Sequence, residues 1–140
     1  MYEIIQKAHS GWAYLVLLTL LFAFINSLVK RSSQKEFQPQ DRKIALVGLI
    51  ATHLQLVIGF ILYFVSPLGL AAFGQMNDKT LRLTSLEHPL INVIAIVLIT
   101  IGWSKHKKAA DSQAKFKSIA VFYGLGLLLI LSRIPWSLWF

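Results

Sequence analysis

The segment from Trp12 to Leu28 reads WAYLVLLTLLFAFINSL and carries no charged side chain. Three further strongly apolar segments follow it, so that the candidate spans cover residues 8–29, 44–65, 88–104 and 118–138. A helix needs about 20 apolar residues to cross the roughly 30 Å hydrocarbon core of a bilayer. The sequence therefore predicts an all-α integral membrane protein, a four-helix bundle of up-down-up-down topology in which residues 1–140 form a single transmembrane domain.

The composition excludes several other classes of protein. Apolar residues make up 56% of the chain and charged residues only 14%, whereas a soluble domain normally carries about a quarter charged residues. These figures argue against a disordered chain and against a soluble one. The sequence has no cysteine, which excludes disulfides, thiolate-held zinc or iron–sulfur centres and a cysteine nucleophile. No Ser–His–Asp arrangement or phosphate-binding loop is recognisable, so no catalytic residue is assigned.

The net charge of +8 is concentrated in two connecting segments. Ten of the fourteen Lys and Arg residues fall within residues 30–43 and 105–117. Because cytoplasmic loops of membrane proteins are rich in Lys and Arg, both segments are predicted to be cytoplasmic. We therefore expect a multi-pass protein of the cytoplasmic (inner) membrane with both termini and residues 66–87 outside. The charge sets orientation and does not indicate nucleic-acid binding, since no nucleic-acid recognition motif accompanies it.

A few polar side chains interrupt the spans, and each is a candidate functional residue because a polar group in lipid is costly. With a rise of 1.5 Å per residue from the cytoplasmic end of each helix, His9 lies about 31 Å up, His88 and Arg133 about 24 Å, and His53 about 15 Å. The first three thus share the outer third of the membrane, and His53 lies near the middle. His106, between two lysines, is predicted to be a solvated loop residue.

The helix face on which each of these residues lies indicates which of them point into the bundle. His9, His88 and Arg133 each head a stripe of small or polar side chains at helical spacing. Small residues mark contacts between membrane helices, so these three faces are expected to converge on the bundle interior. His53 lies about 120° from the centre of the small and polar stripe on its own helix, and is predicted to face another neighbour or a second copy of the chain.

Two histidines on facing helices indicate axial ligation of haem, since neutral imidazole is a common iron ligand and bundles hold cofactors between facing helices. His9 and His88 are the preferred pair by depth, His53 is the substitute for either, and Arg133 would neutralise a haem propionate. Without a Cys-x-x-Cys-His sequence, the haem would be non-covalent b-type. The predicted role is electron transfer or redox support, with the lipid bilayer, a redox partner protein or quinone, and a second copy of the chain in a homodimer as partners.

A metal site is the first alternative. His9, His88 and Glu87 near one surface suit Zn²⁺ or Cu²⁺, both of which accept imidazole and carboxylate ligands. The side chains of the adjacent Glu87 and His88 point about 100° apart on a regular helix. Both would bind one ion only at a frayed helix start, and Pro89 marks such a start.

Other interpretations assign no cofactor. His53, Thr52 and Gln55 suit a proton or solute path through the membrane. The two histidines near the outer surface are also typical of hydrated interfacial side chains, and Arg133 of a side chain that extends to the headgroups. A non-catalytic membrane scaffold or assembly factor would need no cofactor and would tolerate alanine at all three histidines in the spans.

Several short motifs run through the sequence: HSGW from His9, THLQL from Thr52 with YFVSP from Tyr63, EHP from Glu87 and IPW from Ile134. They resemble, over nearly the whole chain, a group of small four-span bacterial membrane proteins described as cytochrome-b-like. The resemblance implies b-type haem with histidine ligands, which map onto His9, His53 and His88. The architecture is more distantly similar to the four-helix membrane protoporphyrinogen oxidases, from which no activity is carried over.

Overall fold

The computed structural model describes residues 1–139, and these form helices and turns without a strand. The long helices are α1 (Tyr2–Ser32), α2 (Pro39–Val65), α4 (His88–Lys108) and α5 (Ser112–Ser132). The short ones are the 3₁₀ turn η1 (Leu70–Ala72), α3 (Lys79–Arg82), the π-helical turn η2 (Leu83–Glu87) and α6 (Trp136–Trp139). The predicted all-α bundle is confirmed.

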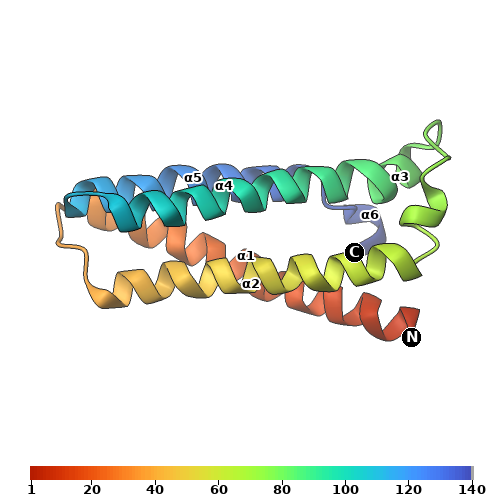
Figure 1. The fold of residues 1–140 in the computed structure, drawn as a ribbon, viewed down its shortest axis with the longest axis horizontal. Coiled ribbons are helices and arrows are strands. Elements are labelled where there is room, and N and C mark those ends of the chain that lie inside the picture. The colour runs from red at the N-terminus through yellow and green to blue at the C-terminus, as the bar shows by residue number, and fades with distance from the viewer. Residues whose placement is uncertain (140) are drawn as a thin grey trace.

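The long helices lie side by side and alternate in direction (Figure 1). Both termini, α3 and α6 lie together at one end, which we call the terminal end. The α1–α2 and α4–α5 turns lie at the other, which we call the basic end because most Lys and Arg residues fall there. Helix α4 packs along α5, and α1 packs along both α2 and α5, whereas α2 and α4 meet over a shorter length.

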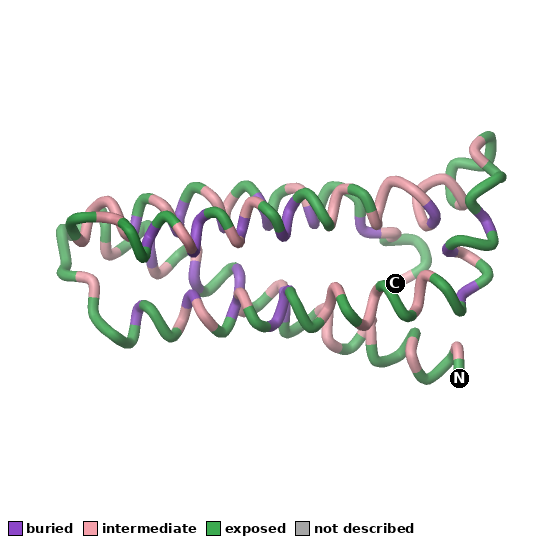
Figure 2. Tube along the Cα trace, viewed as in Figure 1, coloured by how far each residue is buried: buried purple, intermediate pink, exposed green. Residues whose placement is uncertain are grey.

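Lipid, and not protein, covers most of the apolar surface. Four helical segments are long and apolar enough to cross a membrane, the third of them being α4 with α3 and η2 as its extension. Only 22% of the most apolar window is buried in α1 and in α2, rising to 39% in α5. Figure 2 shows exposed positions along the outer sides of the helices and buried ones where helices face each other. The chain is therefore a multi-pass membrane protein.

Small residues let α4 and α5 approach closely. A Cβ atom added at Gly102 would lie 2.5 Å from Cβ of Phe122, and one added at Gly126 would lie 2.6 Å from Cγ1 of Ile99. Both positions thus need glycine for the helices to stay in contact. The predicted role of small residues as helix contacts is confirmed on this pair of helices.

The fourth helix ends earlier than the predicted span, at Ser132 instead of residue 138. Arg133 leaves the helical region with φ −130° and ψ 23°, and Pro135 follows two residues later. Because a proline disfavours helical geometry at the residue before it, Ile134 cannot continue the helix. The chain turns there, and α6 lies across the terminal end (Figure 1).

The prediction that His106 is a solvated loop residue is wrong. Helix α4 continues to Lys108, so His106 lies on its inward face and is only 1% exposed. Its ring centroid lies 4.5 Å from that of Trp103 and 5.4 Å from that of Phe37. Nδ1 donates a hydrogen bond to the carbonyl of Trp103 at 2.5 Å. His106 is thus part of the packed basic end.

A buried carboxylate also holds the basic end together. Asp41, 2% exposed in the first turn of α2, accepts hydrogen bonds from Nζ of Lys30 at 2.6 Å and from Nδ2 of Asn26 at 3.0 Å. It also accepts one from the backbone N–H of Gln38 at 2.8 Å. Every oxygen of this carboxylate is therefore bonded, and the network ties α1 to α2.

Candidate functional site

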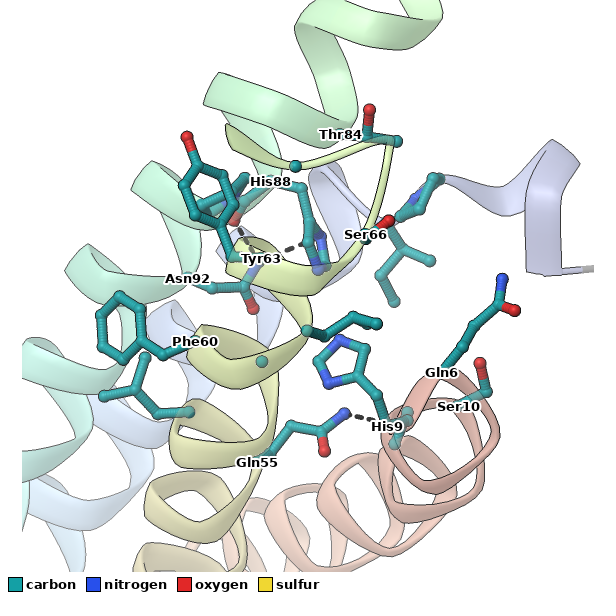
Figure 3. A pocket seen from close by; sticks show the side chains of 18 of the residues that line it. Gln6, His9, Ser10, Gln55, Phe60, Tyr63, Ser66, Thr84, His88 and Asn92 are labelled. Atoms are coloured by element: carbon teal, nitrogen blue, oxygen red, sulfur yellow. Dashed lines mark hydrogen bonds between the residues drawn. The ribbon is translucent and has the colours of Figure 1, made fainter. Parts of the chain in front are cut away.

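A cavity of about 260 Å³ lies at the terminal end, between α1, α2, α4 and the segment that follows α5. The short contact between α2 and α4 leaves room for it. Most of its lining is apolar. The polar side chains that line it and are labelled in Figure 3 are Gln6, His9, Ser10, Gln55, Tyr63, Ser66, Thr84, His88 and Asn92.

The imidazole rings of His9 on α1 and His88 on α4 point toward each other across this cavity (Figure 3). Their centroids are 6.2 Å apart and their planes are at 88°. Counting residues along upright helices places the two histidines about 7 Å apart in depth. Helix α4 continues to Lys108, which places His88 further from the inner end of its helix, and the oblique course of α1 in Figure 1 reduces the rise of α1 along the bundle axis. Both reduce the difference in depth between the two rings.

The backbone around it fixes the orientation of His88. Its Nδ1 donates a hydrogen bond to the carbonyl of Arg133 at 2.9 Å, just past the end of α5. Nδ2 of Asn92, one turn along α4, donates to the carbonyl of His88 at 2.6 Å. Because a carbonyl oxygen can only accept, this bond requires the proton on Nδ1, which leaves the lone pair of Nε2 available to a ligand.

The surroundings of His9 hold two buried polar atoms without a partner in residues 1–139. They are Nδ1 of His9 and Oε1 of Gln55. The same Gln55 donates from Nε2 to the carbonyl of His9 at 2.7 Å. A Cβ added at Gly59 would lie 3.2 Å from Cε1 of His9, so the glycine lets the ring lie against α2. Unpaired buried polar atoms are uncommon, and these two belong to residues that line the cavity, which makes the cavity a candidate binding site.

His53 lies apart from the cavity. Its side chain is exposed on the outer face of α2, Nδ1 donates to the carbonyl of Leu49 at 2.7 Å, and Oγ1 of Thr100 lies 3.4 Å from Nε2. These contacts join α2 to α4 on the lipid side. The structure therefore brings His9 and His88 together and leaves the third histidine of the spans outside.

Glu87 pairs with arginines instead of joining the two histidines. One carboxylate oxygen lies 3.2 Å from Nε of Arg82 and the other 3.9 Å from Nε of Arg133. In residues 1–139 no group of three or more His, Asp or Glu is placed to hold a metal ion. Helix α4 begins at His88 with Pro89 in its first turn, as the proline predicts, but this start is not frayed because η2 continues directly into it.

Arg133 contributes its carbonyl to the site, whereas its side chain lies outside the cavity lining. The guanidinium is half-exposed, and Nη1 donates to the carbonyl of Ser132 at 2.9 Å. Gln55 and Gly59 belong to the small and polar stripe that the sequence predicts on α2, and the structure places this part of the stripe against His9.

Two opposed imidazoles in an apolar cavity supply two neutral nitrogen ligands and no charge. Such a site suits a group that brings its own remaining ligands and is itself largely apolar. Comparisons of the chain with protein families, with curated proteins and with solved structures found no match. The function of the site is therefore inferred from its geometry.

Proposed function

We propose that this protein binds b-type haem non-covalently between His9 and His88 and transfers electrons in the membrane. The separation of the two rings supports this. Two imidazole rings on facing helices, close together beside an apolar cavity, are the arrangement in which His9 and His88 would hold a haem iron between them. The 6.2 Å between the rings of His9 and His88 agrees with that arrangement.

The ligand set favours haem over a bare metal ion. Zinc takes three or four protein ligands, and copper sites also need more than two, whereas haem iron needs only axial ligands because the porphyrin supplies four nitrogens. Residues 1–139 offer the two histidines and no third ligand beside them. The apolar lining suits a porphyrin, and Gly59 leaves space beside the ring of His9.

The residues that surround His9 and His88 also support a haem site. The bond from His88 Nδ1 to the carbonyl of Arg133 holds the ring and makes Nε2 a better donor, as is usual for metal-bound histidine. Gln55 holds the backbone of His9, and both residues keep a buried polar atom without a partner in residues 1–139. The guanidinium of Arg133, half-exposed beside the site, is our candidate for a haem propionate.

Haem bound in this way supplies a reversible one-electron couple. By the positive-inside rule we assign the basic end to the cytoplasmic side, which puts His9 and His88 near the outer surface of the inner membrane. A redox protein or a quinone would then exchange electrons at the terminal end. This assignment is consistent with the resemblance to cytochrome-b-like proteins.

An absorbance spectrum tests the proposal. The protein is produced with a supply of haem, purified in detergent and measured oxidised and after dithionite reduction. We expect one haem per chain and a Soret band that shifts on reduction. His9→Ala and His88→Ala should each lose the bis-histidine spectrum. His53→Ala is the matched control and should keep it, because His53 lies outside the cavity.

The same preparation separates the alternatives. A protein that is colourless and takes up no haem on reconstitution would overturn the proposal. Stoichiometric zinc or copper by elemental analysis, lost in His9→Ala and His88→Ala, would instead establish the metal site. If neither cofactor binds and alanine at all three histidines leaves the folded protein intact, a scaffold or assembly role would be the better account.

A further inference from the structure

A second hollow lies on the lipid side of the bundle, between α1 and α5. It is an open groove of about 600 Å³ whose walls are mainly leucine side chains. Leu128 on one wall is 64% exposed and Leu21 on the other is 43% exposed. Gly124 also lines the groove, and an added Cβ there would be 2.6 Å from the ring of Phe24. Glycine at this position thus lets the ring of Phe24 lie against α5.

Two cations line the groove toward the basic end. Arg31 lies in the last turn of α1 and Lys117 in the second turn of α5. Neither has an ion-pair partner among residues 1–139, and no acidic residue lines the groove. Some other cations at this end are engaged by protein groups: Lys30 binds Asp41, and Arg42 lies 5.2 Å from the ring centroid of Trp103. Arg31 and Lys117 are available to an external anion.

We propose that this groove binds an anionic phospholipid, with the phosphate between Arg31 and Lys117 and an acyl chain along α1 and α5. Basic pockets between membrane helices recognise anionic headgroups in this way. The groove extends from Lys117 to Leu131, which is about 21 Å along a helix and enough for an acyl chain of one leaflet, about 15 Å. The site does not depend on haem.

A second copy of the chain is a poorer occupant. A symmetric dimer through this face would bring Arg31 and Lys117 close to the same two residues of the second copy. No carboxylate in the groove would offset the repulsion among those four positive charges. A lipid phosphate supplies the negative charge that the groove lacks.

Native mass spectrometry tests the headgroup contact. Delipidated protein in detergent is mixed with equal amounts of phosphatidylglycerol and phosphatidylethanolamine of the same chain length. We expect the wild type to retain phosphatidylglycerol preferentially, and Arg31→Gln with Lys117→Gln to lower that preference about tenfold. The matched control is Lys35→Gln with Lys108→Gln, which removes the same charge from the basic end outside the groove and should keep the preference.

Val121→Trp tests the acyl contact, because Val121 lines the groove and is 44% exposed, so a larger side chain enters the groove without entering the core. We expect it to weaken phosphatidylglycerol binding with both cations intact. Equal loss in the groove and control charge variants would overturn the proposal, since it would show general attraction to the basic end. Unaltered binding in Val121→Trp would also overturn it, as would a dimer that excludes lipid from the wild type.

Discussion

The two ends of the bundle treat their polar groups in opposite ways. At the basic end, Asp41 is fully hydrogen-bonded and His106 is packed between aromatic rings with Nδ1 bonded. At the terminal end, two buried polar atoms, on His9 and Gln55, have no partner within residues 1–139 and lie beside a cavity. The first end is built for stability, and the second leaves groups free for a ligand.

Whether a buried polar group has a hydrogen-bond partner separates structural from candidate functional residues in this protein. Both kinds are buried, so burial alone does not separate them. Paired groups satisfy each other, and removing one member costs stability because the other is left buried and unbonded. Groups that face a cavity unpaired should instead affect binding. Substitutions at the two ends should therefore separate into two classes of effect.

The largest effect is expected at the basic end, from Asp41→Ala. This change leaves Lys30 and Asn26 without their acceptor, and breaking a buried charge pair destabilises a protein by about 3 kcal/mol. We expect a lower unfolding midpoint in detergent, with the haem spectrum of the remaining folded protein unchanged. Lys30→Met in the same chain should recover part of the loss, because no charge is then left unpaired. Loss of haem from the folded variant would contradict the separation of the two ends.

At the terminal end, Gly59→Val should affect binding and not folding. The new side chain would push against the ring of His9, whose Cε1 already lies 3.2 Å from a Cβ at this position. We expect haem affinity to fall by about tenfold or more, as for other changes that displace a ligand. Gly11→Val is the matched control, because a Cβ at Gly11 has no neighbour within 4 Å. Equal affinities for haem in the two variants would contradict the placement of His9.

The sequence predicts the spans and singles out the two histidines that lie together, because both depend on features that each segment carries alone. Apolar length defines a helix, and a lone histidine among leucines is conspicuous. Which histidines lie close together depends on how the helices pack, and only the structure shows this. His53 is as conspicuous as His9, but the face of α2 on which it lies is turned to lipid. The oblique course of α1 and the extra turn of α4, which together bring His9 and His88 to similar depths, depend on packing between helices and leave no local pattern.

At the basic end, the sequence does not predict which polar residues are buried. Asp41 and His106 lie next to lysines and arginines, so their sequence context is typical of solvated loops. Helices α2 and α4 both extend past the predicted spans, and the extra turns bury these side chains against partners from other segments. A high density of charged residues in the sequence therefore does not predict that their neighbours are exposed. Contacts from other segments bury Asp41 in a hydrogen-bond network and His106 between aromatic rings.

A smaller effect is expected from Gln55→Leu. It removes the hydrogen bond to the carbonyl of His9 and the unpaired Oε1, and leaves both histidine rings in place. We expect haem still to bind with up to about tenfold lower affinity, and its reduction potential to shift, because outer groups tune a bound metal. Gln55→Glu keeps an acceptor but has no donor for the carbonyl of His9, so it should not restore the affinity. A potential identical to that of the wild type in Gln55→Leu would show that Gln55 has no part in orienting His9.

The smallest effect is expected from His106→Phe. Phenylalanine keeps the ring contacts with Trp103 and Phe37 and loses only the hydrogen bond to the Trp103 carbonyl, which is worth about 1 kcal/mol. The unfolding midpoint should fall slightly, and the haem spectrum and potential should stay as in the wild type. Lys108→Ala, at the exposed end of the same helix, should change neither stability nor spectrum. A haem spectrum altered by His106→Phe would mean that the basic end also senses the cofactor, whereas a change in stability alone confirms that only the terminal end holds its polar groups ready for a ligand.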